Sequence, residues 1–266
     1  MSTKTTEVIL FDDLGRGDVA RVGGKNASLG EMVVKLSERG VAVPPGFATT
    51  AEAYWRFVDA NGLLEPMQKA FNDLQAGRAT LAETGKILRQ AFVRGDWPEE
   101  TAQAIRRAYQ VLCERIGREQ ADMAVRSSAT AEDLPDASFA GQQETFLNIR
   151  GEKALLDACR RCYASLFTDR AISYREIKGF DHFKVALSVG VQVMVRSDLG
   201  GAGVMFSIDT ETGFDKVAII NAAWGLGETV VQGTVEPDEY QVFKPLLSNE
   251  NLLPIIEKRL GAKEKK

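Results

Sequence analysis

Apolar residues in the first half of the chain recur with helical spacing. Between residues 25 and 38 they fall at intervals of three and four, which predicts an amphipathic helix that follows a short strand at residues 8–11. Thr49 and Thr50 are typical N-cap residues and predict the start of a second helix. The same spacing continues through residues 62–118, so this whole stretch is predicted to be helical.

After residue 120 the pattern changes to short strands and two further helices. The strongest alternation in the chain predicts a long strand with one aliphatic face, carried by Val185, Leu187, Val189, Val191, Val193 and Val195. The other predicted strands are 123–125, 145–149, 202–208, 216–222 and 239–243, and the predicted helices are 152–167 and 169–177. This change of pattern suggests a domain boundary near residues 183–190.

Composition excludes several classes of protein. The chain has 266 residues, of which 44% are hydrophobic, and a net charge of −4, which gives no general attraction to nucleic acid. It contains no apolar run of the roughly 18 to 20 residues that a membrane helix needs, and no secretory leader is recognised at its N-terminus. We therefore expect a cytoplasmic protein with neither nucleic acid nor membrane as a partner.

The cysteine pair and the single histidine are predicted to have structural roles. Cys159 and Cys162 form a C-x-x-C pair, but they lie within a predicted helix and have no second pair, so buried thiols are favoured over a redox or zinc site. His182 is the only histidine, which excludes sites with several histidines and favours a turn residue over a catalytic one.

Two basic residues are candidates for binding an anion. The segment from Gly23 to Asn26 is not a Walker A motif, because Val19 stands where that motif needs glycine and Asn26 where it needs Ser or Thr, yet Lys25 at a helix start can still meet an anion. Arg126 lies at the end of a predicted strand and offers a fixed fork of donors suited to phosphate. The small-residue segment after it suits a closing lid, and equally a surface loop with Arg126 in a structural ion pair.

Five segments in order resemble one enzyme family. They are residues 23–32, 43–50, 125–145, 203–210 and 223–228 with 237–239. Together they resemble the phosphoenolpyruvate synthase family, whose relatives, pyruvate phosphate dikinase and rifampicin phosphotransferase, share some of the segments. Residues 139–143 differ from the Met-rich lid of the dikinase, and the drug phosphotransferase stays the alternative.

The resemblance implies an α+β fold of the ATP-grasp type, with two lobes and mostly antiparallel sheets. The first lobe would span residues 1–190 with a helical insertion near 62–118, and an incomplete second lobe would span residues 191–266. Lys25 and Arg126 would be the phosphate-binding cations. By the same resemblance the lid would include Gly141, Gln142 and Thr145, and an interlobe hinge facing adenine would include Gln192, Met194 and Val195.

The resemblance also implies a reaction. Complete members convert ATP, pyruvate and water to AMP, phosphoenolpyruvate and phosphate through a carrier-histidine domain and a pyruvate-binding barrel domain. This chain is expected to be the N-terminal ATP-binding part, to lack both of those domains and to be inactive in the full reaction by itself. Mg²⁺ is expected as a cofactor with its ligands beyond residue 266, and an ATP-binding module without catalysis stays open as another alternative.

Overall fold

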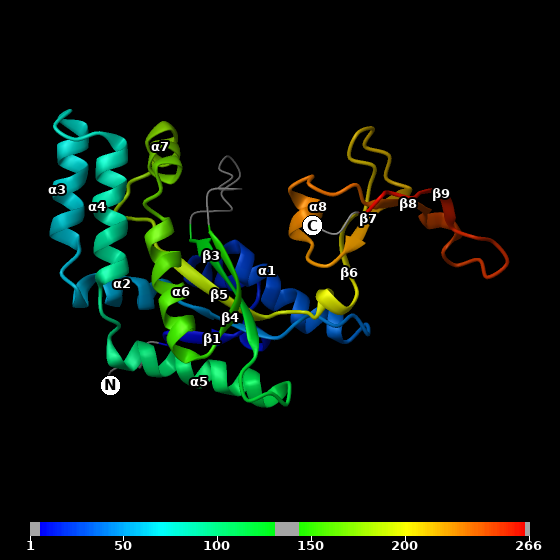
Figure 1. Ribbon diagram of the computed structural model, residues 1–266, viewed down its shortest axis with the longest axis horizontal. Coiled ribbons are helices and arrows are strands. Elements are labelled where there is room, and N and C mark those ends of the chain that lie inside the picture. The colour runs from blue at the N-terminus through cyan, green and yellow to red at the C-terminus, as the bar shows by residue number, and fades with distance from the viewer. Residues whose placement is uncertain (1–5, 131–143, 264–266) are drawn as a thin grey trace. The chain divides into compact units, whose positions relative to one another are not determined.

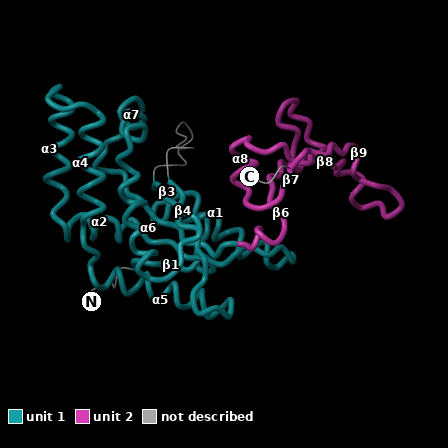
Figure 2. The backbone as a smooth tube through the Cα atoms, viewed as in Figure 1, with its two compact units in different colours: residues 1–194 teal, residues 195–266 magenta. Residues whose placement is uncertain are grey.

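The computed structural model describes residues 6–130 and 144–263 (Figure 1). The predicted lid residues Gly141 and Gln142 lie outside the described residues. The chain divides into two compact units, residues 1–194 and 195–266 (Figure 2). This division lies at the end of a strand, four residues after the boundary expected from the sequence.

The first unit is built on a five-stranded sheet in which all the paired strands are antiparallel. Its strands, in spatial order, are β1 (Val8–Leu10), β2 (Gly46–Thr49), β5 (Leu187–Val193), β3 (Asp122–Ala129) and β4 (Thr145–Arg150). β5 is the last of these strands along the chain and lies between β2 and β3. The combination of helices with antiparallel sheets confirms the α+β class.

Helices cover both faces of this sheet. α1 (Val19–Ser37) packs on one face, against β3 and β5, while α2 (Ala51–Ala60), α5 (Glu99–Arg115) and α6 (Glu152–Ser165) pack on the other. α3 (Leu64–Gln75), α4 (Leu81–Arg94) and α7 (Asp169–Lys178) extend the second layer. The part predicted to be helical near residues 62–118 contains α3, α4 and α5.

The burial of β5 agrees with the predicted aliphatic face and shows that the opposite face is buried as well. Leu187, Val189 and Val191 point into the large core with α2, α5 and α6, as their alternation predicts. Ser188 and Gly190, on the opposite face, are buried as well, because α1 lies directly on them. Small side chains on this face therefore let a helix approach the strand closely.

α1 begins earlier than predicted and is interrupted. Helical geometry breaks at Gly23, whose φ of 74° and ψ of 161° lie in a region that only glycine adopts readily, and it resumes at Gly24. The next N-cap agrees with the prediction, because the side chain of Thr50 accepts a hydrogen bond from the backbone N–H of Ala53 at 3.3 Å.

The second unit contains a four-stranded antiparallel sheet. Its order is β6 (Gly201–Phe206), β7 (Val217–Trp224), β8 (Asp238–Phe243) and β9 (Ile255–Arg259), and the short helix α8 (Glu228–Val231) follows β7. β6, β7 and β8 lie close to the predicted ranges. Neither β9 nor α8 was predicted, because each is too short to show a clear period.

The structural assignments of the cysteines and the histidine are confirmed. Cys159 and Cys162 are buried in α6, and burial raises the pKa of both thiols. His182 lies in a turn, is buried and stacks on Phe71 with ring centroids 4.0 Å apart. Among the described helices, none has both the length and the apolar character of a membrane span.

Candidate functional site

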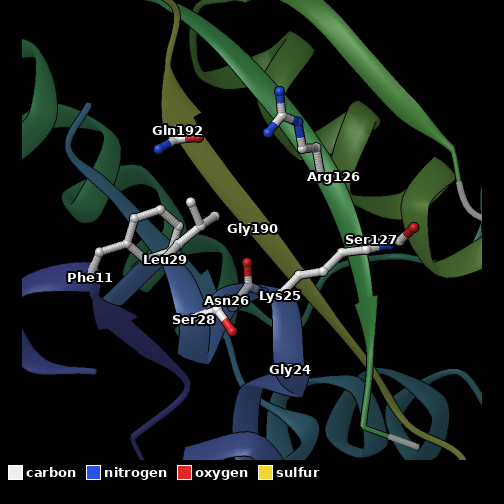
Figure 3. Close-up of a pocket in the computed structure, with 10 residues that line it drawn as sticks. All are labelled: Phe11, Gly24, Lys25, Asn26, Ser28, Leu29, Arg126, Ser127, Gly190 and Gln192. Carbon is white, nitrogen blue, oxygen red and sulfur yellow. The ribbon is translucent and has the colours of Figure 1, made fainter. Parts of the chain in front are cut away.

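A pocket of about 340 Å³ lies in the first unit, between α1 and the sheet (Figure 3). Its lining comes from the short 3-10 turn that follows β1, the part of α1 after the break at Gly23, β3 and β5. The lining residues are Phe11, Gly24, Lys25, Asn26, Ser28, Leu29, Arg126, Ser127, Gly190 and Gln192. Three of the predicted site residues, Lys25, Arg126 and Gln192, therefore meet in one hollow although they are far apart in sequence.

The break at Gly23 sets the position of Lys25. Because helical geometry resumes at Gly24, Lys25 lies in the first turn of the restarted helix, where backbone N–H groups and the helix dipole favour an anion. The side chain of Lys25 is exposed and extends toward β3 near Ser127 (Figure 3). This arrangement brings an ammonium group and a helix N-terminus to the same side of the pocket.

Arg126 lies in the middle of β3, which corrects the prediction that it ends a strand. β3 continues through Ala129 because the small residues after Arg126 pair with β5 instead of leaving the sheet. Arg126 is paired with Thr145 on β4 and with Gly190 on β5, so the three residues share one face of the sheet. A central strand thus fixes the base of the Arg126 side chain.

The alternative of a structural ion pair finds no support in the described part of the chain. Within residues 6–130 and 144–263, Arg126 forms no ion pair. Thr145, its neighbour on β4, is exposed and is not one of the residues that line the pocket. The Arg126 side chain is exposed on this face of the sheet.

Gln192 lies on the same face of β5 as Gly190, toward one end of the pocket. Its side-chain Nε2 donates a hydrogen bond to the backbone oxygen of Pro44 at 3.1 Å, which fixes the amide. Phe11 and Leu29 lie on the same side of the view as Gln192 (Figure 3). The pocket consequently has an apolar region in addition to its cationic one.

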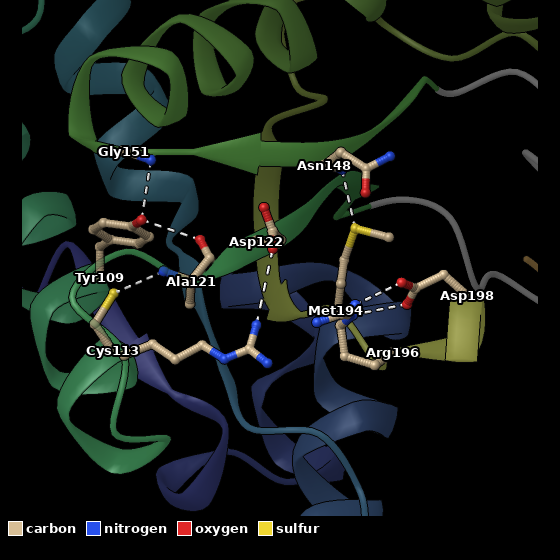
Figure 4. A network of polar contacts seen from close by, with 10 residues as sticks. Tyr109, Cys113, Ala121, Asp122, Asn148, Gly151, Met194, Arg196 and Asp198 are labelled. Carbon is tan, nitrogen blue, oxygen red and sulfur yellow. Dashed lines mark hydrogen bonds and ion pairs between the residues drawn. The ribbon is translucent and has the colours of Figure 1, made fainter. Parts of the chain in front are cut away.

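The last two predicted hinge residues, Met194 and Val195, do not line this pocket. The N–H of Met194 donates to the backbone oxygen of Asp122 at 2.9 Å, and the Met194 sulfur accepts from the N–H of Asn148 at 3.0 Å (Figure 4). Val195 is exposed and begins the second unit. Of the expected hinge, only Gln192 reaches the pocket.

The charged residues that line the pocket, among those that the structure describes, are both cations. They are Lys25 and Arg126, and no aspartate or glutamate is among the described lining residues. Within the described residues, no cluster of three or more His, Cys, Asp or Glu side chains could hold a metal ion. The lining is suited to a ligand that carries negative charge at one end.

Some lining residues were not predicted as site residues. Asn26 is polar although it occupies an apolar position of α1, and Gly190 interrupts a row of valines in β5. Both departures from the local pattern are visible in the sequence, and each marks a place where α1 meets the sheet. Phe11 carries no such signal, because an aromatic residue after a strand is ordinary.

Comparisons with known proteins give a consistent result. The family described as "Pyruvate phosphate dikinase, AMP/ATP-binding domain" matches residues 19–266. The chain is 57% identical to phosphoenolpyruvate synthase of Synechocystis sp. over 98% of its own length, and 54% identical to that of Escherichia coli over 97%. It is 47% identical to a probable phosphoenolpyruvate synthase of Methanothermobacter thermautotrophicus over 89%.

The chain spans about a third of the length of these relatives, since it covers 32% of the first two and 34% of the third. The family match extends over both compact units, from the first residue of α1 to residue 266. The resemblance found in the sequence is therefore confirmed, and the chain belongs to the family of the pyruvate phosphate dikinase AMP/ATP-binding domain.

Proposed function

We propose that this chain binds ATP in the pocket between α1 and the five-stranded sheet, with the phosphates at Lys25 and Arg126. The proposal rests on one observation. These two cations come from separate segments and line one pocket, next to the point where the helix α1 resumes after Gly23. A polyphosphate suits this site because each cation forms charge-assisted hydrogen bonds with phosphate oxygens. Family membership supports the same ligand.

The adenosine part would occupy the region near Phe11, Leu29 and Gln192. Apolar side chains suit the faces of a base, and a fixed amide supplies a directed polar contact. The Met194 N–H could bind adenine only after losing its hydrogen bond to Asp122, so the proposed hinge contact from Met194 requires a local rearrangement.

The finer features expected from the family are part of this proposal. They are an ATP-grasp arrangement in two lobes and a lid that includes Gly141, Gln142 and Thr145. The exposed position of Thr145, next to Arg126 on β4, is compatible with such a lid. Mg²⁺ would accompany the nucleotide, but the described lining residues include no carboxylate that would hold it.

We also propose that the chain serves as the ATP-binding part of a phosphoenolpyruvate synthase. The relatives named above carry that name, which favours this acceptor chemistry over that of a drug phosphotransferase. In this proposal, pyruvate and water are the final acceptors, and a carrier-histidine domain and a pyruvate-binding barrel domain are the partners. A pyruvate-dependent assay of AMP formation with the longer protein would test that wider assignment.

Calorimetric titration with ATP and with adenosine tests binding by this chain. Lys25→Ala is expected to weaken ATP binding by about 1.5 to 3 kcal/mol, the scale of a hydrogen bond to a charged group, and to leave adenosine binding unchanged. Lys35→Ala is the matched control, because Lys35 lies on the same helix and pairs with Glu31 outside the pocket. Absence of ATP binding by the unmodified chain would refute the proposal.

A further inference from the structure

Asn26 is a buried polar residue on the core-facing side of α1. It follows Val22 by four residues and precedes Leu29 by three, so it occupies a position where helical spacing calls for an apolar side chain. Its exposed fraction is 2%. Burial of an amide is unfavourable unless the amide is hydrogen-bonded, so Asn26 requires partners inside the protein.

Those contacts tie the helix to the centre of the sheet. Asn26 Nδ2 donates to the backbone oxygen of Val22 at 3.1 Å and to the hydroxyl of Ser188 on β5 at 2.9 Å. The Ser188 hydroxyl in turn donates to the backbone oxygen of Thr49 on β2 at 2.5 Å. A continuous chain of hydrogen bonds therefore runs from α1 through β5 to β2.

Close packing accompanies these hydrogen bonds. A Cβ atom built on Gly190 would lie 2.1 Å from Asn26 Oδ1, so the amide rests directly on the bare backbone of β5. On the other side of Lys25, a Cβ atom on Gly23 would lie 2.2 Å from the hydroxyl oxygen of Ser128 on β3. Lys25 thus lies between two points at which α1 is held against the sheet.

We infer that Asn26 is a positioning residue, which fixes the first helical turn after the break at Gly23 against the sheet so that Lys25 faces the pocket. The inference rests on the proposed function, because the benefit of fixing Lys25 is a correctly placed ammonium group for phosphate. An apolar side chain at position 26 could fill the same volume, but it could not donate to Val22 and Ser188. Directional hydrogen bonds specify one position of the helix on the sheet, whereas apolar contacts permit several.

A double-mutant cycle in the full chain tests this role. Asn26→Ala is expected to raise the dissociation constant for ATP about tenfold, but to raise it less than about twofold when Lys25 is already alanine, because coupled residues are not additive. Adenosine affinity stays unchanged. A purely structural role would instead lower both affinities, or would lower ATP affinity equally in the two backgrounds.

Asn61 provides a matched control. Its Nδ2 donates to the backbone oxygen of Phe57, four residues earlier, at 2.8 Å, and to that of Asp96 at 2.9 Å, so it anchors α2 much as Asn26 anchors α1. Asn61 is not among the lining residues. Asn61→Ala should therefore leave ATP affinity unchanged, and an equal loss in both variants would overturn the inference.

Hydrogen exchange gives a test that needs no ligand. Amides of residues 24–29 should exchange about tenfold faster in Asn26→Ala and in Ser188→Ala, because either change breaks the link from α1 to β5, whereas Asn61→Ala should not affect them. Ser188→Ala serves if Asn26→Ala does not fold. Unchanged exchange in the Ser188 variant would overturn the positioning role, whereas failure of the unmodified chain to bind ATP would overturn only the proposed function.

Discussion

Replacing Gly23 with alanine is expected to destabilise the first unit severely, for two separate reasons. The φ of 74° and ψ of 161° at Gly23 lie in a region that costs a residue with a side chain about 1 to 3 kcal/mol. The new Cβ would also lie 2.2 Å from the Ser128 hydroxyl oxygen and 2.8 Å from the backbone oxygen of Ala129. Backbone atoms of a central strand cannot move aside easily, so overpacking adds about 1 to 3 kcal/mol.

The expected loss in the free energy of unfolding is therefore about 2 to 6 kcal/mol. Urea denaturation followed by tryptophan fluorescence measures it. Trp224 is the one tryptophan of the second unit, so a Trp224→Phe background confines the signal to Trp55 and Trp97 in the first unit. Gly40→Ala is the control, since Gly40 has a φ of 76° with nothing within 4 Å of its Cβ position.

The difference between the two variants includes the cost of the close contact of α1 with β3, which Gly40 lacks. Gly40→Ala should cost only about 1 to 2 kcal/mol, because it meets the left-handed backbone penalty without a clash. If Gly23→Ala costs no more than Gly40→Ala, α1 does not approach β3 this closely at Gly23, and this contact does not position Lys25.

Three further predictions concern Arg126, His182 and the two buried thiols of α6. Arg126→Ala should weaken ATP binding by about 1.5 to 3 kcal/mol in calorimetry. Arg150 is an exposed arginine on β4, and Arg150→Ala should leave ATP binding unchanged. Equal ATP affinities of the Arg126 variant and the unmodified chain would show that Arg126 is not part of the site. Burial, with the Arg175 guanidinium beside it, lowers the pKa of His182 to about 4, so the unfolded chain takes up a proton first as pH falls. Up to about 3 kcal/mol of the free energy of unfolding is therefore lost between about pH 6.5 and 4. His182→Gln should lose less over that range when the free energy of unfolding is measured by urea titration at each pH. The same pH dependence in the variant and the unmodified chain would contradict this. Because burial raises the pKa of Cys159 and Cys162, thiol reagents should label them only after unfolding, and rapid labelling of the native chain would contradict their burial.

Elements with a clear period were predicted from the sequence with good accuracy. The alternation of valines located β5, and the three- and four-residue spacing located most of α1, because in both cases the apolar residues point into a core. The Thr50 cap was also predicted, since its hydrogen bond depends only on residues three apart. Local patterns are reliable where local geometry decides which side chains are buried.

Other elements depend on partners that lie far away in sequence. β2 follows two prolines and begins at Gly46, which locally indicates a turn, yet pairing with β1 and β5 makes it a strand. β3 continues past Arg126 through serines and an alanine, which locally resemble a loop. In both cases the neighbouring strands satisfy backbone groups that a turn or loop would leave to water.

In the candidate site, too, some features could be predicted from local sequence and others depend on residues far away in the chain. Lys25, Arg126 and Gln192 could be selected from residue type and family resemblance, and the structure brings all three to one pocket. The contact of Asn26 with Gly190 could not be predicted, because the two residues are 164 positions apart in the sequence. Neither the helical spacing around Asn26 nor the alternation around Gly190 indicates which residue lies opposite. The roles proposed for Gly141 and Gln142 stay predictions.

The position of β5 has a consequence for how the chain acquires its structure during synthesis. β5 inserts between β2 and β3, and it is the last strand of its sheet to leave the ribosome. Until then, the β1–β2 pair and the β3–β4 pair have no strand to join them, and each exposes an open edge to other nascent chains. The long sequence separation between β2 and β5 also predicts slow closure, so a chaperone that shields these edges would act mainly before residue 193 emerges.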